Sequence, residues 1–355
     1  MPTLPEAPDA LLAALRAALA HERHPWAGVG LELLPEKGLA HDHVRLQGTG
    51  ALARIPRQSQ MRLGARENLA YQAACFERAQ ASGHVPRLLG RLSPSIQLPR
   101  GALLVEEIVG RPAQLPADLD AMARALAALH ALALPDTRAP LLNAADPLAD
   151  LADEIAAQAL HLGAAAVAPE VKREIGKQQA ALSALCAAPA RPPRHLIAFD
   201  GHPGNFIVRG DGRAILVDLE KCRYSYPGLD LAHATLYTST TWDLDCCATL
   251  SFDQVLGFYA AWAAAVPGSA AGDARPWHVP LRRAMWLWSV TWCAKWRALS
   301  GLAANATADG EDWSSERSGA VLVAHVQDRV DHYLSASVIA QVLAEFDALD
   351  VALGE

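Results

Sequence analysis

The chain contains 355 residues, of which 52% are hydrophobic and 19% are charged, a composition typical of a folded protein rather than a disordered one. Its formal net charge of −7 leaves no basic surplus to attract a phosphate backbone, so we expect no nucleic-acid partner. The six cysteines form no CxxC pair, residues 1–24 lack the pattern of a signal peptide, and no apolar run is long enough to span a membrane. We therefore expect a cytoplasmic protein without a membrane segment.

The first third of the chain mixes helical and strand patterns. Apolar residues at helical spacing alternate with short apolar segments that glycines punctuate. The pattern predicts two helices, over 8–23 and 64–82, and five short strands, three within 30–57 and one each within 86–92 and 101–110. Gly83 follows the second helix, where glycine is favoured as a C-terminal cap. We assign residues 1–108 to this α+β unit.

The remainder of the chain, residues 109–355, has mainly helical spacing. Helices are expected over 118–132, as a pair within 147–188, and from about 228 to the end. Two short apolar runs, within 195–208 and 212–220, interrupt the helices. The Asp-Gly pair between them predicts a hairpin.

Two acidic residues and one asparagine stand out in this hairpin. Asp200 ends the first apolar run, Asn205 follows a Pro-Gly turn, and Asp218 lies on the second arm. Folding the arms together brings Asp218 close to Asn205, and their oxygens suit a hard cation such as Mg²⁺. Asp200 is then available to accept a proton from a hydroxyl, an arrangement typical of phosphoryl transfer. The alternative is that the Asp-x4-Asn spacing arises by chance and that an asparagine next to a glycine is ordinary turn chemistry.

Several segments resemble one known family. The sequence FDGHPGN resembles the HGDxHPGN loop of the aminoglycoside phosphotransferase and choline kinase group, and VDLE followed by YPGLDLA resembles its metal-binding segment. The segments ARALAALHAL and GHVPRLLG are also similar, so the resemblance extends over about 30–240. It implies a two-lobed, protein-kinase-like α+β fold. The small N-terminal lobe has an antiparallel sheet and an extra helix, and the larger C-terminal lobe is mainly helical.

The resemblance implies a Mg²⁺-dependent kinase that transfers the γ-phosphate of ATP, or GTP, to a hydroxyl of a small molecule. Asp200 matches the catalytic base, and Asn205 and Asp218 match the Mg²⁺ ligands. Aminoglycosides, choline-like amines, sugars and amino-acid alcohols all fit as acceptors. The sequence gives no indication of the oligomeric state.

Three further residues of this region match the family's pattern. His202 corresponds to a structural histidine of the loop, and Asp230 to an aspartate that braces the loop. Glu220, two residues beyond Asp218, either approaches the metal or substrate or is solvated.

The nucleotide is expected between the two lobes. Arg54 on the third strand matches the basic residue that anchors phosphate, with Arg57 as the alternative, and arginine is not equivalent to the usual lysine. Gly38 is the glycine of a sparse phosphate-binding loop. The residues expected near the base are Glu106, Glu107 and Ile108.

Departures from the family pattern leave a second hypothesis open. Ala198 and Phe199 replace the usual His-Gly, and Gln72 stands where a glutamate partner of the basic residue is expected, with Glu67 or Glu77 as substitutes. These differences keep a pseudokinase-like nucleotide-binding or interaction module as the alternative. Four tryptophans, at positions 286, 288, 292 and 296, either build the core or line an acceptor pocket. Asp243 and Asp245 either add negative charge to such a pocket or cap a helix.

Overall fold

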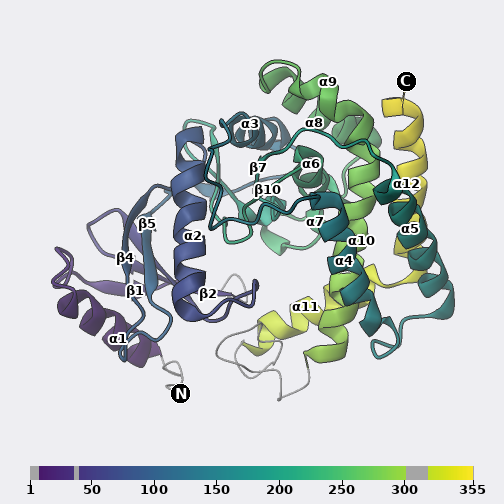
Figure 1. The fold of residues 1–355 in the computed structure, drawn as a ribbon. Helices are drawn as coiled ribbons and strands as arrows, with labels where there is room; N and C mark the ends of the chain where they lie inside the picture. Colours follow the sequence, from purple (N-terminus) through teal and green to yellow (C-terminus); the bar gives the residue numbers. More distant parts are fainter. Residues whose placement is uncertain (1–7, 36–39, 301–318, 355) are drawn as a thin grey trace. The chain divides into compact units, whose positions relative to one another are not determined.

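The structure is a computed structural model that describes residues 8–35, 40–300 and 319–354. The chain divides into two compact units (Figure 1). The first unit comprises Met1–Gln80, Pro86–Ile108 and Leu299–His325, and the second comprises Ala81–Val85, Val109–Ala298 and Val326–Glu355. No helix of the described ranges is long and apolar enough to cross a membrane.

The first unit is built on a five-stranded antiparallel sheet with the order β1-β2-β3-β5-β4. The expected strands are confirmed, with bounds β1 (Leu31–Leu33), β2 (His41–Leu46), β3 (Ala51–Pro56), β4 (Leu88–Leu92) and β5 (Ala102–Glu106). Side chains alternate between the faces of each strand. The β3 residues Ala53 and Ile55 therefore point to one face, and Arg54 points to the other.

One helix packs on each face of this sheet. Helix α1 (Pro8–His21) buries Leu11, Leu15 and Leu19 against Ala53 and Ile55. Helix α2 (Ala65–Ala79) lies on the Arg54 face, where the guanidinium carbon is 5.6 Å from the centroid of Phe76. The 3₁₀ turn η1 (Gln80–Ser82) follows α2, and Gly83 then has a φ of +70°, the left-handed backbone that favours glycine.

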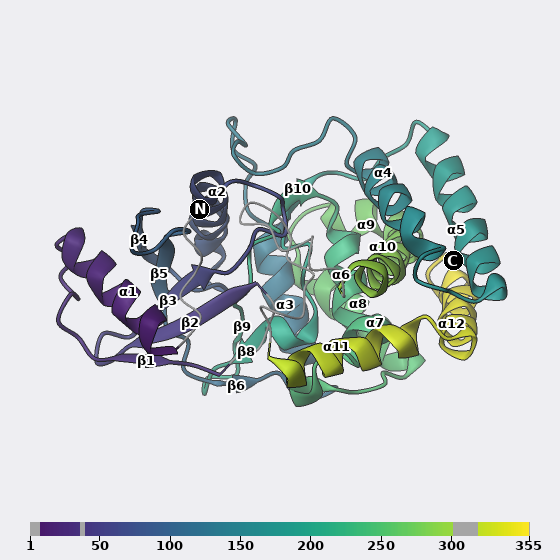
Figure 2. The same ribbon diagram turned by 90° about the horizontal axis from the view of Figure 1, so that it is seen from below.

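The second unit is mainly helical, as the spacing indicates (Figure 2). Its α-helices are α3 (Leu119–His130), α4 (Pro147–Ala159), α5 (Pro169–Ala187), α6 (Pro227–Thr235), α7 (Tyr237–Thr240), α8 (Phe252–Ala265), α9 (Ala270–Ala274), α10 (His278–Leu299) and α12 (Ala336–Gly354). Helix α11 (Ala320–Tyr333) begins in the first unit and belongs to the second from Val326 onward. Its 3₁₀ turns are η2 (Leu160–Leu162), η3 (Pro203–Asn205), η4 (Leu244–Cys246) and η5 (Arg275–Trp277). The amphipathic α3 buries Met122, Leu126 and Leu129 and packs against α8.

Two small sheets hold the segment that contains the acidic positions. One has the order β6-β8-β9, formed by β6 (Arg111–Pro112), β8 (Phe206–Val208) and β9 (Ala214–Leu216); the other pairs β7 (His195–Ile197) with β10 (Arg223–Ser225). Strands β8 and β9 form the expected antiparallel hairpin. Gly212 in its turn has a φ of +82°, which glycine adopts without steric cost.

A buried ion pair connects three helices of the second unit. Arg282 on α10 is 0% exposed and donates to Glu345 of α12, and its guanidinium also donates to the hydroxyl and carbonyl oxygens of Thr235 at the end of α6. A buried charge requires partners of this kind. These contacts join the C-terminal helix to the helix that follows the hairpin.

Candidate active site

The loop between β7 and β8 carries Asp200 and Asn205, and the β8–β9 hairpin brings the segment with Asp218 next to this loop. The Asn205 side-chain amide donates to the backbone carbonyl of Asp200 at 2.8 Å. The backbone carbonyl of Asn205 accepts from the Val217 N–H at 2.9 Å, next to Asp218. The hairpin therefore holds Asp200, Asn205 and Asp218 in one small region.

The oxygens at this position suit a hard cation that keeps part of its water shell. Because the Asn205 amide nitrogen donates to Asp200, the Asn205 side-chain oxygen is the atom suited to a metal. The carboxylate of Asp218, the residue after Val217, is the second candidate donor. No group of three or more His, Cys, Asp or Glu residues that could hold a metal occurs within 8–35, 40–300 and 319–354. Mg²⁺ is commonly bound through one or two carboxylates together with waters and substrate phosphates, so this sparse donor set fits Mg²⁺ bound with a nucleotide.

Asp200 lies in an ion pair that the sequence did not indicate. Its Oδ2 is 2.7 Å from Lys221 Nζ, and its Oδ1 is 3.6 Å from His233 Nδ1. Burial alone would raise the pKa of Asp200, but the charge of Lys221, with contributions from His202 and His233, outweighs burial and lowers the pKa well below its usual range. Asp200 is therefore a carboxylate that is ionised at neutral pH.

The partners of Asp200 respond to the same burial in different ways. Burial lowers the pKa of His233 to about 4 despite the nearby carboxylate, so this imidazole is neutral at neutral pH. For Lys221, burial opposes the charged form, but Asp200 and Glu220 outweigh it and raise the pKa. The only signal for Lys221 in the sequence is its position directly after VDLE.

Asp230 holds the start of the loop. It is 0% exposed, and its carboxylate accepts the backbone N–H groups of Ala198 at 2.8 Å and Phe199 at 2.7 Å. His130 Nε2 lies 3.0 Å from the same carboxylate, and His130 Nδ1 accepts from Trp262 Nε1 at 3.0 Å. Contacts from α3 and α8 thus reach the loop through one buried carboxylate on α6.

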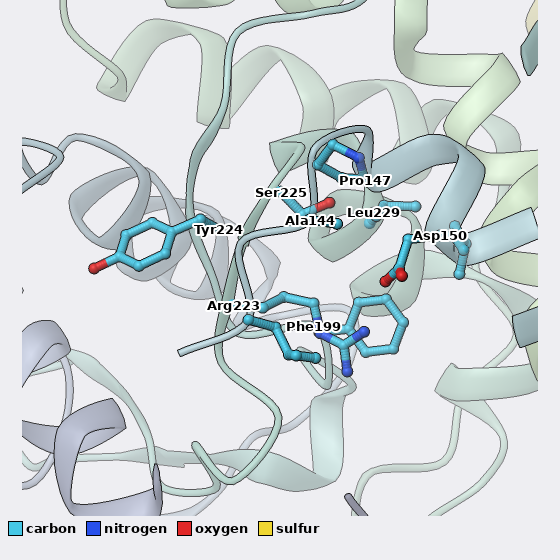
Figure 3. Close-up of a pocket in the computed structure, with 10 residues that line it drawn as sticks. Ala144, Pro147, Asp150, Phe199, Arg223, Tyr224, Ser225 and Leu229 are labelled. Atoms are coloured by element: carbon cyan, nitrogen blue, oxygen red, sulfur yellow. The ribbon is translucent and has the colours of Figure 1, made fainter. Parts of the chain in front are cut away.

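Phe199 has a φ of +64°, a left-handed conformation that costs a non-glycine residue roughly 1–3 kcal/mol. It stands where the family pattern has glycine, a residue that adopts this conformation without steric cost. The Arg223 guanidinium lies 3.6 Å from the Phe199 ring centroid (Figure 3). Trp288 packs edge-on against the same ring, with the two ring centroids 5.2 Å apart. The contacts of the ring with Arg223 and Trp288 therefore help to offset the strain.

A small cavity lies next to this stacked pair. It is partly open to solvent, and Phe199, Arg223, Ser225 and Asp150 are among its lining residues (Figure 3). The cavity therefore lies beside Phe199, the residue before Asp200 in the loop.

The two remaining residues expected in this loop region are both placed beside the site. His202 Nδ1 accepts the backbone N–H of Gly204 at 3.2 Å and so caps the 3₁₀ turn η3. Glu220 is 4% exposed, and its backbone N–H lies 3.5 Å from Asp218 Oδ1. The buried position of Glu220 excludes the solvated role for its side chain.

The candidate phosphate-anchoring residue lies in the first unit. Arg54 is 5% exposed on β3 and packs over Phe76 of α2. Gln72 of α2 is also buried, and its side-chain oxygen is 3.0 Å from Nε2 of His41 on β2. Arg57, the alternative anchor, forms an ion pair with Asp42 at 2.5 Å.

The expected base-binding residues lie at the end of β5. Glu106 pairs with Arg87 at 3.2 Å and Glu107 with Arg45 at 2.7 Å, so both carboxylates have partners within the first unit. Ile108 is 9% exposed.

Three expected residues of the first unit remain: the two glutamates proposed as substitutes at the Gln72 position, and the loop glycine. Glu67 is exposed in the first turn of α2, and Glu77 pairs with Arg91 at 2.8 Å. Gly38 lies outside the described residues.

The tryptophans of α10 belong mainly to the core. Trp286, Trp288 and Trp296 are 0%, 7% and 3% exposed. Trp292 is partly exposed and packs edge-on against Trp242. Lys221 Nζ lies over the Trp288 ring, 5.5 Å from its centroid. The Lys221 ammonium therefore takes the position over this indole face that a cationic substrate would need.

Gly204 is required by the close approach of Asp243. A Cβ added at Gly204 would lie 2.5 Å from Asp243 Oδ2 and 2.9 Å from Asp243 Cβ, so Gly204→Ala is expected to lower the free energy of unfolding by roughly 1–3 kcal/mol. Urea denaturation measures this change. Gly210→Ala is the matched control, because an added Cβ there meets nothing within 4 Å, and equal losses in both variants would contradict the steric explanation.

Comparisons with known proteins identify the family and the fold of the chain. Residues 34–265 match the model of the phosphotransferase enzyme family (APH), whereas a search of curated sequences gave no match. The fold is similar to that of a choline/ethanolamine kinase family protein from Mesorhizobium loti, with a TM-score of 0.56, 19% identity, and coverage of 94% of this chain and 98% of that one.

Two further solved structures share the fold. An ethanolamine kinase from Plasmodium vivax has a TM-score of 0.61 at 14% identity, covering 95% of this chain and 91% of that one. A ternary complex of APH(2'')-IIa with streptomycin and ATP has a TM-score of 0.51 at 13% identity, covering 89% and 96%. The fold is that of the protein-kinase-like phosphotransferases, and because the family model matches well over half of its residues, the chain belongs to the phosphotransferase enzyme family.

Proposed function

We propose that this protein is a Mg²⁺-dependent kinase that transfers the γ-phosphate of ATP, or GTP, to a hydroxyl group of a small molecule. The observation that carries the proposal is the joint placement of Asp200, Asn205 and Asp218 by the 2.8 Å bond from the Asn205 amide to the Asp200 carbonyl and the 2.9 Å bond from Val217 to Asn205. A carboxylate free of metal beside two metal-binding oxygens is the set that phosphoryl transfer requires.

Each residue has a distinct part in the proposed reaction. Asp200, ionised and held by Lys221, orients the acceptor hydroxyl and takes its proton as the phosphoryl group arrives. Asn205 and Asp218 would hold Mg²⁺, which neutralises phosphate charge when bound. Asp230 and His202 keep the loop in position. Arg54 is proposed to contact the nucleotide phosphates, with backbone groups near Ile108 beside the base.

The structures with a similar fold suggest which substrates to test. One solved structure with this fold contains ATP and streptomycin, and others are described as choline or ethanolamine kinases. We propose ATP as the first substrate to test. All six cysteines are free, which supports our proposal of a reducing, cytoplasmic location.

Thermal denaturation with ATP, in the presence and absence of Mg²⁺, tests nucleotide binding. We expect ATP to raise Tm more with Mg²⁺ than without it, because a ligand of the folded state stabilises that state. Asp218→Asn should remove most of the Mg²⁺-dependent part, whereas Asp211→Asn, at an exposed carboxylate in the hairpin turn, should not. No shift with ATP in either condition would contradict the proposal.

Turnover requires a second measurement, because binding alone does not show catalysis. Consumption of ATP is measured against a panel of hydroxyl compounds that includes amino alcohols, aminoglycosides, sugars and hydroxy amino acids. The replacement of the usual His-Gly by Ala198 and Phe199 and the position of Gln72 favour one alternative, a nucleotide-binding module without catalysis. A Mg²⁺-dependent shift without turnover on any acceptor would support that alternative.

A further inference from the structure

Five residues beside Asp200 form a closed set of ionic and aromatic contacts, here called the Trp288 cluster: Glu154, Phe199, Lys221, Arg223 and Trp288. Lys221 connects the cluster to the site, because its ammonium lies 2.7 Å from Asp200 Oδ2 and 5.5 Å from the centroid of the Trp288 ring. A cation near an indole face is attracted by the negative potential of the ring. Lys221 is thus held from two directions, by a carboxylate and by an aromatic face.

The orientation of Trp288 is fixed by its own partners. Its Nε1 donates to Glu154 Oε1 at 2.7 Å, and Glu154 Oε2 lies 3.8 Å from the Arg223 guanidinium. Arg223 in turn lies 3.6 Å from the centroid of Phe199 (Figure 3), and Phe199 packs edge-on against Trp288. The indole therefore cannot turn without breaking a hydrogen bond and a ring contact, so its face stays under Lys221.

The position of Lys221 determines which carboxylate oxygen of Asp200 is left for the acceptor hydroxyl. Lys221 binds Oδ2, whereas Oδ1 is 3.6 Å from His233 Nδ1, a nitrogen that lies 3.2 Å from the carbonyl oxygen of Phe199. A lysine has a long flexible stem and three rotatable donors. Without the indole, its ammonium could move to either oxygen of the carboxylate.

We propose that Trp288, held by Glu154, is a positioning residue that keeps Lys221 on Asp200 Oδ2 and so directs the acceptor hydroxyl to Oδ1. The effect on phosphotransfer rests on the proposed function. The positioning of Lys221 itself does not, so the two can be tested separately.

Chemical labelling tests the position of Lys221 without any need for turnover. Each variant is treated with acetic anhydride at neutral pH, and acetylation of the Lys221 peptide is measured by mass spectrometry relative to exposed lysines. In Trp288→Phe, which loses the bond to Glu154 and has a weaker aromatic face, Lys221 labelling is expected to rise roughly 2- to 10-fold. Glu154→Gln should increase it less, because the amide oxygen still accepts the indole N–H.

Trp286→Phe is the matched control. Trp286 lies two residues earlier on α10, is 0% exposed and packs against Phe346. Its replacement loosens the core without touching Lys221, so Lys221 labelling should remain at the wild-type level. Equal labelling of Lys221 in the Trp288 and Trp286 variants would overturn the proposal.

Kinetics then test whether the positioning serves the reaction. With ATP and an acceptor from the panel, Trp288→Phe should lower kcat while the KM for ATP stays unchanged, and it should cause no further loss in a Lys221→Met background. A full additional loss in that background would show that Trp288 acts independently of Lys221 and would overturn the kinetic part. If labelling changes as expected but wild-type protein transfers no phosphate to any acceptor, the proposed function fails and the positioning of Lys221 stands.

Discussion

Replacing Asp200 with Asn is expected to lower the rate of phosphotransfer by roughly 10²–10⁴-fold while Mg²⁺-dependent binding of ATP changes little. The charges around Asp200, mainly Lys221, lower its pKa against the effect of burial, so the wild-type side chain is ionised at neutral pH and ready to accept a proton. An asparagine keeps the shape but cannot take that proton. Steady-state turnover and the ATP-dependent Tm shift, measured on the same protein, check the two halves of this prediction.

Two further variants make the Asp200 result interpretable. Asp200→Asn removes the partner of the buried Lys221 ammonium, which by itself destabilises the fold. In the double variant Asp200→Asn/Lys221→Gln the charge is again balanced, so stability should recover while activity does not. Asp211→Asn, at an exposed turn, should retain full activity. Wild-type turnover in a folded Asp200→Asn protein would remove Asp200 from the mechanism.

Asp230→Ala is expected to lower the free energy of unfolding by about 3–5 kcal/mol, a large part of the 5–15 kcal/mol typical of a native protein. The substitution removes the acceptor of two backbone N–H groups, at Ala198 and Phe199, and the partner of His130. These groups would be left buried without a hydrogen bond. Urea denaturation gives the loss of stability, and turnover of the folded fraction shows whether the loop has also moved.

A milder change separates stability from loop geometry. His130→Gln keeps a donor near Asp230 but loses the ring that accepts from Trp262, so we expect a smaller loss of stability and retained turnover. Asp253→Ala, an exposed carboxylate in the first turn of α8, serves as the surface control. A loss in Asp230→Ala no larger than in Asp253→Ala would show that Asp230 does not hold the loop.

The parts of the fold that could be predicted have a local cause. Apolar residues at helical spacing predict α2 and α3 because each helix buries one face, and the Asp-Gly turn predicts the β8–β9 hairpin because its backbone needs left-handed φ values. The proximity of Asn205 and Asp218 follows from that hairpin. The resemblance of FDGHPGN to a known loop supplied the proposed roles, which spacing alone leaves open.

The contacts that could not be predicted join residues far apart in the chain. His130 meets Asp230 across 100 positions, and Trp262 meets His130 across 132. No local sequence pattern shows whether a histidine on an apolar helix face only packs in the core or also bonds to a distant carboxylate. Lys221 was likewise missed, because a lysine after a strand is usually solvated. The bond between Gln72 and His41 depends on how α2 lies on the sheet, which periodicity does not specify.

The left-handed backbone at Phe199 has a consequence for how this loop varies among related sequences. A φ of +64° next to Asp200 can be occupied cheaply by glycine; here a large ring occupies it, with Arg223 and Trp288 against that ring. A change of Phe199 to glycine would leave those two side chains beside an empty space, and a change of either neighbour would leave the strained ring with less support. Substitutions at the three positions are therefore expected to co-vary, so that a relative with His-Gly in this loop should also differ at the positions of Arg223 and Trp288.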